Sequence, residues 1–111
     1  MKLVVAAALL VAATSGVVAH PCDEDARTHA VALLTLHYND GSSDEVENLG
    51  IDDAVKQLPP IKALKGKGKF DVLEVWGHIY KADYRMRFIY AQIPGSCLLM
   101  GQEILEASDP Y

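Results

Sequence analysis

The sequence predicts an α+β fold in which an N-terminal helix packs on a C-terminal three-stranded antiparallel meander. Mainly apolar residues recur at helical spacing soon after residue 22, and apolar and polar residues alternate through roughly the last forty positions. Turn-forming residues divide this alternating stretch into three segments, as expected for consecutive antiparallel strands.

Residues 1–19 have the organisation of a secretory signal peptide. Lys2 supplies a positive charge, residues 3–13 form an apolar segment, and residues 17–19 are the small residues of a cleavage site. We therefore expect residues 20–111 to form a single secreted, extracellular domain. No later apolar run is long enough to span a bilayer, so no membrane insertion is expected.

Cys22 and Cys97 are the only cysteines, and in a small secreted chain such a pair predicts a disulfide. The bridge would close a loop of 75 residues and stabilise the fold by roughly 4 kcal/mol. Two buried free thiols and a bridge between chains are the alternatives.

The charge balance of residues 20–111 is acidic, with nine Lys and Arg against fifteen Asp and Glu and a formal net charge of −6. This balance argues against general binding to nucleic acid or to an anionic membrane. Acids dominate from Asp23 to Asp53 and bases from Ala54 to Arg87. We expect the two halves to lie against each other and neutralise in part.

The stretch from Asp23 to Tyr38 predicts the helix. Its first turn is acidic, which complements the helix dipole, and Asn39-Asp40-Gly41 ends it. The residues at helical spacing are Ala26, Ala30, Leu33 or Leu34, and His37. A strand from Ala30 to Tyr38, with alternate residues on one face, is the alternative.

Two short capped segments are predicted between the helix and the first strand. Ser42-Ser43 caps a turn that Gly50 ends. Asp52 caps a second short helix from Asp53 to Leu58, and Pro59-Pro60 ends this helix.

The segment from Ile61 to Lys69 predicts a mobile basic loop, because glycines alternate with Lys65, Lys67 and Lys69. The lysine ammonium groups and exposed backbone N–H groups could bind phosphate, sulfate or an acidic partner. The glycine spacing differs from that of a phosphate-binding P-loop. A solvated connector is the alternative.

Three antiparallel strands are predicted after this loop, with turns at residues 81–83 and 94–96. The strands run from about Phe70 to Tyr80, from Tyr84 to Ile93, and from Cys97 to Glu106. A two-residue turn at Ala82-Asp83 would place Phe88 between Gly77 and Gly101. In this register the face toward the helix carries Leu73, Val75, Ile79, Met86, Phe88, Tyr90, Leu99 and Leu105.

The opposite face of the predicted sheet, which also carries Gln102, has the residue types that most often anchor binding hot spots. These residues are Trp76, His78, Tyr80, Arg85 and Arg87. In the alternative arrangement the basic loop covers Trp76 and Tyr80, and the arginines are either solvated or paired with Glu74 and Glu103. A register shift of one residue would exchange the two faces.

Catalytic motifs are sparse in this sequence. Three histidines and three acids could supply a general acid and base, but no nucleophile motif accompanies them. They are His29, His37 and His78, with Asp25, Asp71 or Glu74.

A metal site is predicted to be absent, and so is a cofactor. Cleavage after residue 19 would leave His20 with both an imidazole and an α-amino group, which together can bind Cu(II). Asp25 and His29 are also one helical turn apart. Pro21, however, removes the amide nitrogen that would complete an N-terminal copper site.

One helix followed by an antiparallel meander, in a secreted chain of this length, resembles the cystatin architecture. Gln92-Ile93-Pro94-Gly95 echoes the Q-x-V-x-G hairpin of that family, but it follows a different strand. The resemblance therefore implies the architecture alone.

Together these features predict a small secreted binding or interaction protein without catalytic activity. An unknown extracellular protein or small ligand would contact the sheet face or the basic loop. A small metal-assisted or acid–base hydrolase is the alternative, and it would need a concave pocket where a histidine and a carboxylate converge.

Overall fold

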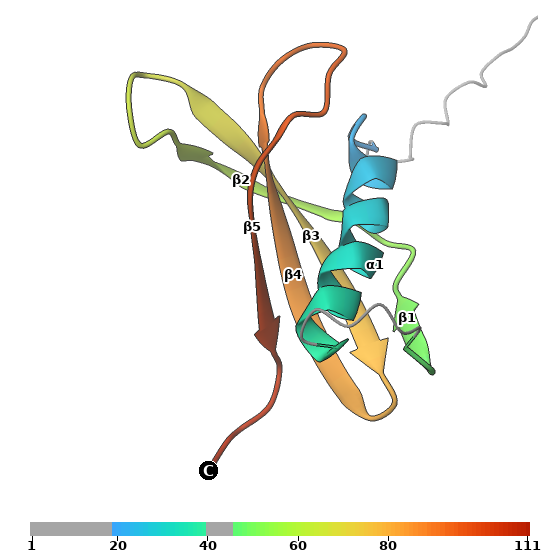
Figure 1. Ribbon diagram of the computed structural model, residues 1–111. Helices are drawn as coiled ribbons and strands as arrows, with labels where there is room; N and C mark the ends of the chain where they lie inside the picture. Colours follow the sequence, from blue (N-terminus) through green and yellow to red (C-terminus); the bar gives the residue numbers. More distant parts are fainter. Residues whose placement is uncertain (1–18, 40–45) are drawn as a thin grey trace, which may run out of the picture.

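The computed structural model describes residues 19–39 and 46–111, which form one helix and one antiparallel sheet of five strands (Figure 1). The elements are α1 (Asp23–Asn39), β1 (Leu49–Ile51), β2 (Lys56–Lys62), β3 (Lys69–Ile79), β4 (Ala82–Ala91) and β5 (Leu99–Glu106). The predicted α+β class is confirmed. The predicted count of three strands is wrong, because β1 and β2 also pair with β3.

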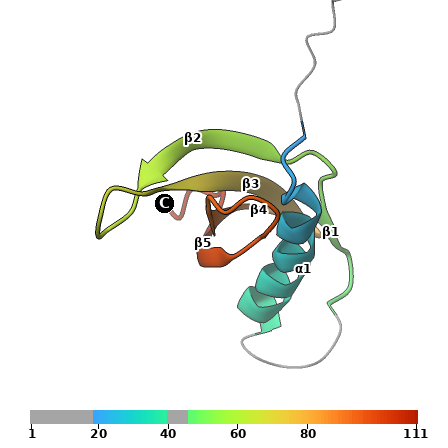
Figure 2. The ribbon, with the colours of Figure 1, turned by 90° about the horizontal axis from the view of Figure 1, so that it is seen from above.

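The strands follow the order β1-β3-β4-β5. β4 pairs with one edge of β3, and β1 and β2 pair with different parts of its other edge. α1 lies across one face of the sheet (Figure 2). It packs chiefly on β3 and β1 and less on β4. β5 therefore lies at the margin of the area that the helix covers.

The helix prediction is confirmed, and the alternative strand over residues 30–38 is wrong. Ala26, Ala30 and Leu34 are the buried residues of α1, and they form one stripe along the helix. Gly77 allows the helix to approach the sheet closely. A Cβ atom at this position would lie 2.8 Å from Leu34 Cδ2 and 2.9 Å from Met86 Cε.

The turn between β3 and β4 differs from the predicted one. Tyr80-Lys81 forms the two-residue connection, and Tyr80 has a positive φ of 57°, as the first central residue of a tight hairpin turn requires. Gly77 consequently lies opposite Tyr84 instead of Phe88, a shift of four residues. Because four is even, the side chains within β3 and β4 keep their predicted faces.

The core forms on the face of the sheet toward α1. Its fully or almost fully buried sheet residues are Leu73, Val75, Ile79, Tyr84, Met86, Phe88 and Tyr90. All six core positions that were predicted on β3 and β4 are therefore buried, and Tyr84 joins them.

The predicted faces of β5 are correct at Leu99 and exchanged beyond it. Leu99 pairs with Tyr90, but a bulge follows, and Gly101 then pairs with Ile89. One extra residue reverses the side-chain alternation. Ile104 consequently packs on the core, whereas Leu105 is 57% exposed.

Two further placements on β5 are corrected by this bulge. Gln102 lies opposite Phe88, on the face toward α1 and not on the opposite face. Phe88 does not cover two glycines, because Gly77 lies opposite Tyr84 and Gly101 opposite Ile89.

The short helix predicted from Asp53 to Leu58 is wrong, since its C-terminal half belongs to β2. Backbone groups of Lys56 and Leu58 are drawn into the sheet because β3 offers a free edge there. Pro59 and Pro60 lack N–H groups, and the register shifts between Leu58 and Ile61.

Residues 1–18 and 40–45 lie outside the described part of the chain. The predicted signal peptide falls almost wholly there, and so does the start of the capped turn at Ser42-Ser43. Gly50, which was expected to end that turn, lies in β1.

Cys22 and Cys97 form the predicted disulfide, with a Cα–Cα distance of 5.7 Å. The bridge joins the start of α1 to the loop between β4 and β5. Cys22 is buried, with 3% of its surface exposed. The disulfide therefore fastens the start of the helix to a loop of the sheet that is 75 residues away in sequence.

Candidate functional site

The predicted basic loop forms the hairpin tip, residues 61–69, which joins β2 to β3 and extends away from α1 (Figure 1). Ala63 N donates to Gly68 O over 2.9 Å. Gly66 has a φ of 80°, a conformation that glycine adopts without strain. The backbone of the tip thus closes its own turn, and its mobility stays a prediction.

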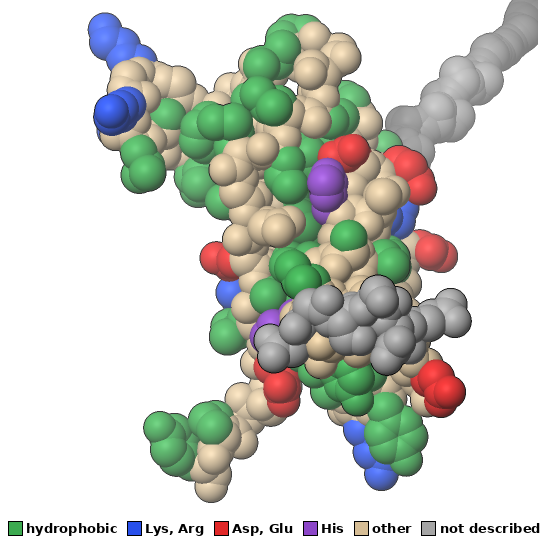
Figure 3. Space-filling model, in the orientation of Figure 1, with side chains coloured by type: hydrophobic (Ala, Val, Ile, Leu, Met, Phe, Trp, Pro, Cys, Tyr) green, Lys and Arg blue, Asp and Glu red, His purple; other side chains and the backbone are tan. Residues whose placement is uncertain are grey.

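The hairpin tip combines unpaired positive charge with exposed apolar surface. Lys62, Lys65, Lys67 and Lys69 are exposed, and none forms an ion pair with a described residue. Leu64 is 100% exposed. Figure 3 shows basic and hydrophobic side chains together at the end of this hairpin. An open cavity of about 430 Å³ adjoins it, lined by Ala63, Leu64, Lys65, Phe70 and Met100.

The outer face of the sheet, turned away from α1, carries four of the five predicted hot-spot residues. Trp76, His78, Arg85 and Arg87 lie on this face, because their positions alternate with those of the buried residues on β3 and β4. Tyr80 instead lies in the β3–β4 turn, where it is 75% exposed. The hairpin tip is at the other end of β3, so it does not cover Trp76 or Tyr80.

Glu74 organises the outer face, a role that the sequence interpretation assigned only as an alternative. Its carboxylate is almost fully buried and accepts hydrogen bonds from Trp76 Nε1 at 3.2 Å and Arg87 Nε at 3.0 Å. Arg85 and Arg87 also approach Glu103, at 3.4 and 3.9 Å. The charges of both arginines are therefore balanced within the sheet.

His78 lies between two carboxylates at the edge of the outer face. Its Nδ1 is 2.7 Å from Asp83 Oδ1, and its Nε2 is 2.8 Å from Asp52 Oδ1. The hydrogen bonds with Asp83 and then Asp52 raise the pKa of His78. Both ring nitrogens can donate at once only in the imidazolium form, so this geometry suits a protonated ring.

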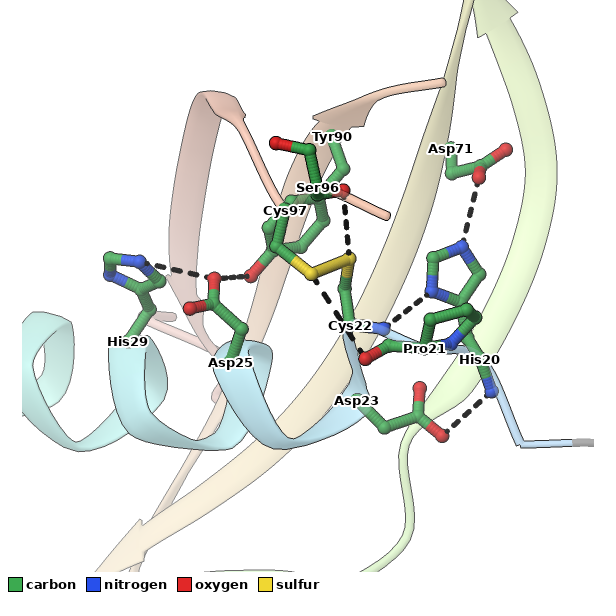
Figure 4. Close-up of a disulfide and its surroundings, with 10 residues drawn as sticks. All are labelled: His20, Pro21, Cys22, Asp23, Asp25, His29, Asp71, Tyr90, Ser96 and Cys97. Carbon is green, nitrogen blue, oxygen red and sulfur yellow. Dashed lines mark hydrogen bonds and ion pairs between the residues drawn. A yellow bond between two sulfur atoms is a disulfide. The ribbon is translucent and has the colours of Figure 1, made fainter. Parts of the chain in front are cut away.

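A second polar cluster lies beside the disulfide (Figure 4). His20 Nδ1 accepts from the backbone N–H of Cys22 at 3.0 Å, and His20 Nε2 is 2.9 Å from Asp71 Oδ2. Gln92 Nε2 donates to the other oxygen of Asp71 at 2.8 Å. The hydrogen bonds from His20 and then Gln92 lower the pKa of Asp71. A cavity of about 320 Å³ adjoins these residues.

Asp25 joins the helix to the sheet in the same region. The hydroxyl of Tyr90 donates to Asp25 Oδ2 over 2.8 Å, and His29 Nε2 lies 3.3 Å from the same oxygen (Figure 4). Burial raises the pKa of Tyr90. The hydroxyl therefore stays protonated, and the network anchors α1 over β4.

The acid–base pairs anticipated from the sequence are only partly formed. Asp25 meets His29 as the helical spacing suggested, but Asp71 meets His20 and Glu74 meets Arg87. Throughout residues 19–39 and 46–111, no group of three or more His, Cys, Asp or Glu side chains is arranged to hold a metal ion. The alternation of β3 and β4 could have revealed the pairing of Glu74 with Arg87, but only once the correct turn was known.

Comparisons with protein-family models, with curated proteins and with solved structures found no match for this chain. The resemblance to cystatins gains no support from them. Within the described residues, no helix is long and apolar enough to cross a membrane.

Proposed function

We propose that this chain is a small secreted binding protein that contacts an acidic extracellular partner through the hairpin tip. One observation carries the proposal. Leu64 is fully exposed among four lysines that have no ion-pair partner in the described part of the chain.

The charge pattern supports the choice of the tip over the arginines. Arg27, Arg85 and Arg87 each form an ion pair with a nearby glutamate. The tip lysines keep their charge available to a partner, in a chain whose net charge is negative. Positive charge held apart from the bulk of the acids steers an acidic partner to one place.

The apolar surface of the tip adds affinity to this steering. Covering a fully exposed leucine contributes about 1.5–3 kcal/mol. Leu64 and the adjoining cavity beside Phe70 and Met100 offer such a surface. A partner segment with carboxylates flanking a large apolar side chain would complement both features.

Secretion is supported by the Cys22–Cys97 disulfide, because such bonds persist in oxidising compartments. The N-terminal residues 1–19 have the pattern of a secretory signal. Both features belong to the proposal, and the disulfide is the part with a structural basis.

The outer face is the second candidate surface. Trp76 and His78 are partly exposed there on β3, and Arg85 Nε is buried without a hydrogen-bond partner among the described residues. This face is less favoured than the tip, since Glu74 and Glu103 already engage its arginines. Its residues would have to exchange internal partners for external ones.

Hydrolysis is less well supported than binding. His20 and Asp71 lie beside a cavity that Ser96 also lines. Both nitrogens of His20 are engaged, one by the Cys22 N–H and one by Asp71. Neither nitrogen is left to accept a proton from a nucleophile.

The test compares capture of partners by variants of residues 20–111 with equal net charge. Lys65→Gln with Lys67→Gln removes two positive charges at the tip, and Lys81→Glu changes the net charge by the same amount elsewhere. Tagged proteins are incubated with the native extracellular fluid, and retained components are quantified. The tip variant is expected to retain at least about tenfold less partner than the wild type, whereas the control retains the wild-type amount.

Retention by the tip variant at the wild-type level would reject the tip as the binding surface. Trp76→Phe and Trp76→Ala test the outer face as the binding surface. Arg87 still donates a hydrogen bond to Glu74 in both variants. Loss of the partner in Trp76→Ala alone would assign binding to the outer face instead.

A further inference from the structure

We propose that β5 pairs with β5 of a second copy of this chain, forming a two-fold symmetric dimer with one continuous antiparallel sheet. This inference does not depend on the function of the hairpin tip. It follows from the backbone groups, the edge protection and the side-chain sequence of β5.

The outer edge of β5 presents backbone groups that no described residue pairs with, since β5 is the last strand of the sheet. Ala107 N donates to Asp83 O over 2.8 Å, so this odd-numbered position points its N–H toward β4. Alternation along the strand then directs the N–H and C=O groups of Gln102, Ile104 and Glu106 outward. These groups form a template for one more strand.

The two margins of the sheet are protected very differently. β2 carries Pro59 and Pro60 and has lysines at both its ends, and such residues discourage pairing with another chain. Beyond its bulge, β5 contains neither proline nor lysine. An unprotected edge of this kind is expected to be covered, and a second copy supplies a strand of matching length.

One register of β5 self-pairing gives compatible side-chain pairs on both faces of the sheet. Two copies related by a two-fold axis can pair only residues on the same face, which limits the choice to registers two residues apart. Centring on Ile104 places the two Ile104 side chains together and sets Gln102 opposite Glu106 on each side. Centring on Glu103 would set two glutamates against each other, which is destabilising.

Side-chain placement on both faces of β5 fits the register centred on Ile104. On the face toward α1, the Ile104 pair would extend the core beyond the helix, and the Gln102 amide would donate to the Glu106 carboxylate. On the outer face, Leu105 would lie beside the methylene groups of Glu103. Leu105 is 57% exposed in the single chain, so pairing would cover apolar surface that now faces water.

Dimerisation would place two hairpin tips on one particle. A partner with repeated acidic segments could then engage both tips, and the second contact would be intramolecular. The contact area is a single pair of strands, so a weak and concentration-dependent dimer is expected.

Sedimentation velocity of residues 20–111 over a range of concentrations tests the proposal, with a dissociation constant expected between about 1 μM and 1 mM. Gln102→Glu would oppose Glu106 with a like charge and should weaken the dimer about fivefold or more. Gln102→Lys would oppose it with an unlike charge and should tighten the dimer. Gln102 is exposed, so both variants should fold, which thermal melting checks.

A wild-type chain that stays monomeric up to about 1 mM would overturn the proposal. Changes in the same direction for Gln102→Glu and Gln102→Lys would also overturn it, because pairing of Gln102 with Glu106 responds oppositely to the two charges. Opposite shifts of the two variants in a concentration-dependent dimer would support it.

Discussion

The buried carboxylate of Glu74 determines how the outer face responds to substitution. It receives hydrogen bonds from Trp76 and Arg87, and it has almost no contact with water. A buried charge without its partners is expensive, whereas an exposed ion pair contributes little. Trp76 and Arg87, which the sequence predicts to form an exposed contact surface, therefore also stabilise the fold.

Arg87→Ala is expected to lower the free energy of unfolding by about 2 kcal/mol, because it removes a charged donor from buried Glu74. Arg85→Ala is the matched control. Its partner Glu103 has a half-exposed side chain, so a loss of less than about 1 kcal/mol is expected. Chemical denaturation of both variants measures the difference. Equal losses would show that Glu74 does not depend on Arg87.

His78 predicts a pH dependence of stability. Asp83 and Asp52 raise its pKa in the folded chain, so protonated His78 favours the folded state. This contribution is complete below the ordinary pKa of 6.5 and is lost as pH rises through the raised value. Solvent screening limits its size, since the His78 side chain is 39% exposed.

Unfolding free energies of wild type and His78→Gln, measured between about pH 5.5 and pH 9, check this prediction. The advantage of the wild type should be largest at the acidic end and should shrink toward the alkaline end. A difference that is constant across the range, or one that grows with pH, would contradict the assigned role of His78.

At the scale of elements, the β2–β3 hairpin and the α1–β3 contact both depend on what β3 provides. β2 contains two prolines, yet it forms because β3 supplies partners before and after them. α1 has only a narrow buried stripe, and it approaches β3 closely because Gly77 has no side chain.

Gly77→Ala is expected to destabilise the protein by about 1–3 kcal/mol, because the added methyl group would overlap Leu34 and Met86, which are fully buried. Gly101→Ala is the control, since its Cβ would lie at an ordinary 3.6 Å from Ile89 Cδ1. Thermal unfolding compares the two. A larger loss for Gly101→Ala would place the helix contact elsewhere.

The hairpin tip is expected to be the first site of limited trypsin cleavage. Lys65 and Lys67 are exposed and each is followed by a glycine, and loop tips open locally at little cost. Mass spectrometry of early fragments identifies the site, and Lys65→Gln with Lys67→Gln should slow the first cut. Initial cleavage at Arg85 or Arg87 would contradict the sheet, because both lie inside β4.

At the scale of the whole molecule, the disulfide and the proposed processing define the mature chain. Intact-mass measurement of secreted protein is expected to give a chain that begins at His20 and contains one disulfide. Reduction should lower the free energy of unfolding by roughly 4 kcal/mol, because the bridge closes a loop of 75 residues. Alkylation of both thiols without prior reduction would contradict the bridge.

The sequence alone was sufficient for the features that depend on local pattern. Helical spacing and an acidic first turn predicted α1, and two-residue alternation predicted six of the core side chains of β3 and β4. A lone pair of cysteines predicted the disulfide. The lysine and glycine composition also located the hairpin tip, although the sequence did not show that its charges lack internal partners.

Only the tertiary structure decided the features that depend on distant segments. Residues 53–58 have a helix-capping pattern, but a free edge on β3 draws their C-terminal half into β2. The turn at Tyr80-Lys81 and the bulge in β5 follow from how whole strands pair, since local preference favoured Ala82-Asp83 and no bulge. Burial of Glu74 likewise needed both strands in register. Local propensities are worth fractions of a kcal/mol, and the pairing of complete strands outweighs them because it acts over many residues at once.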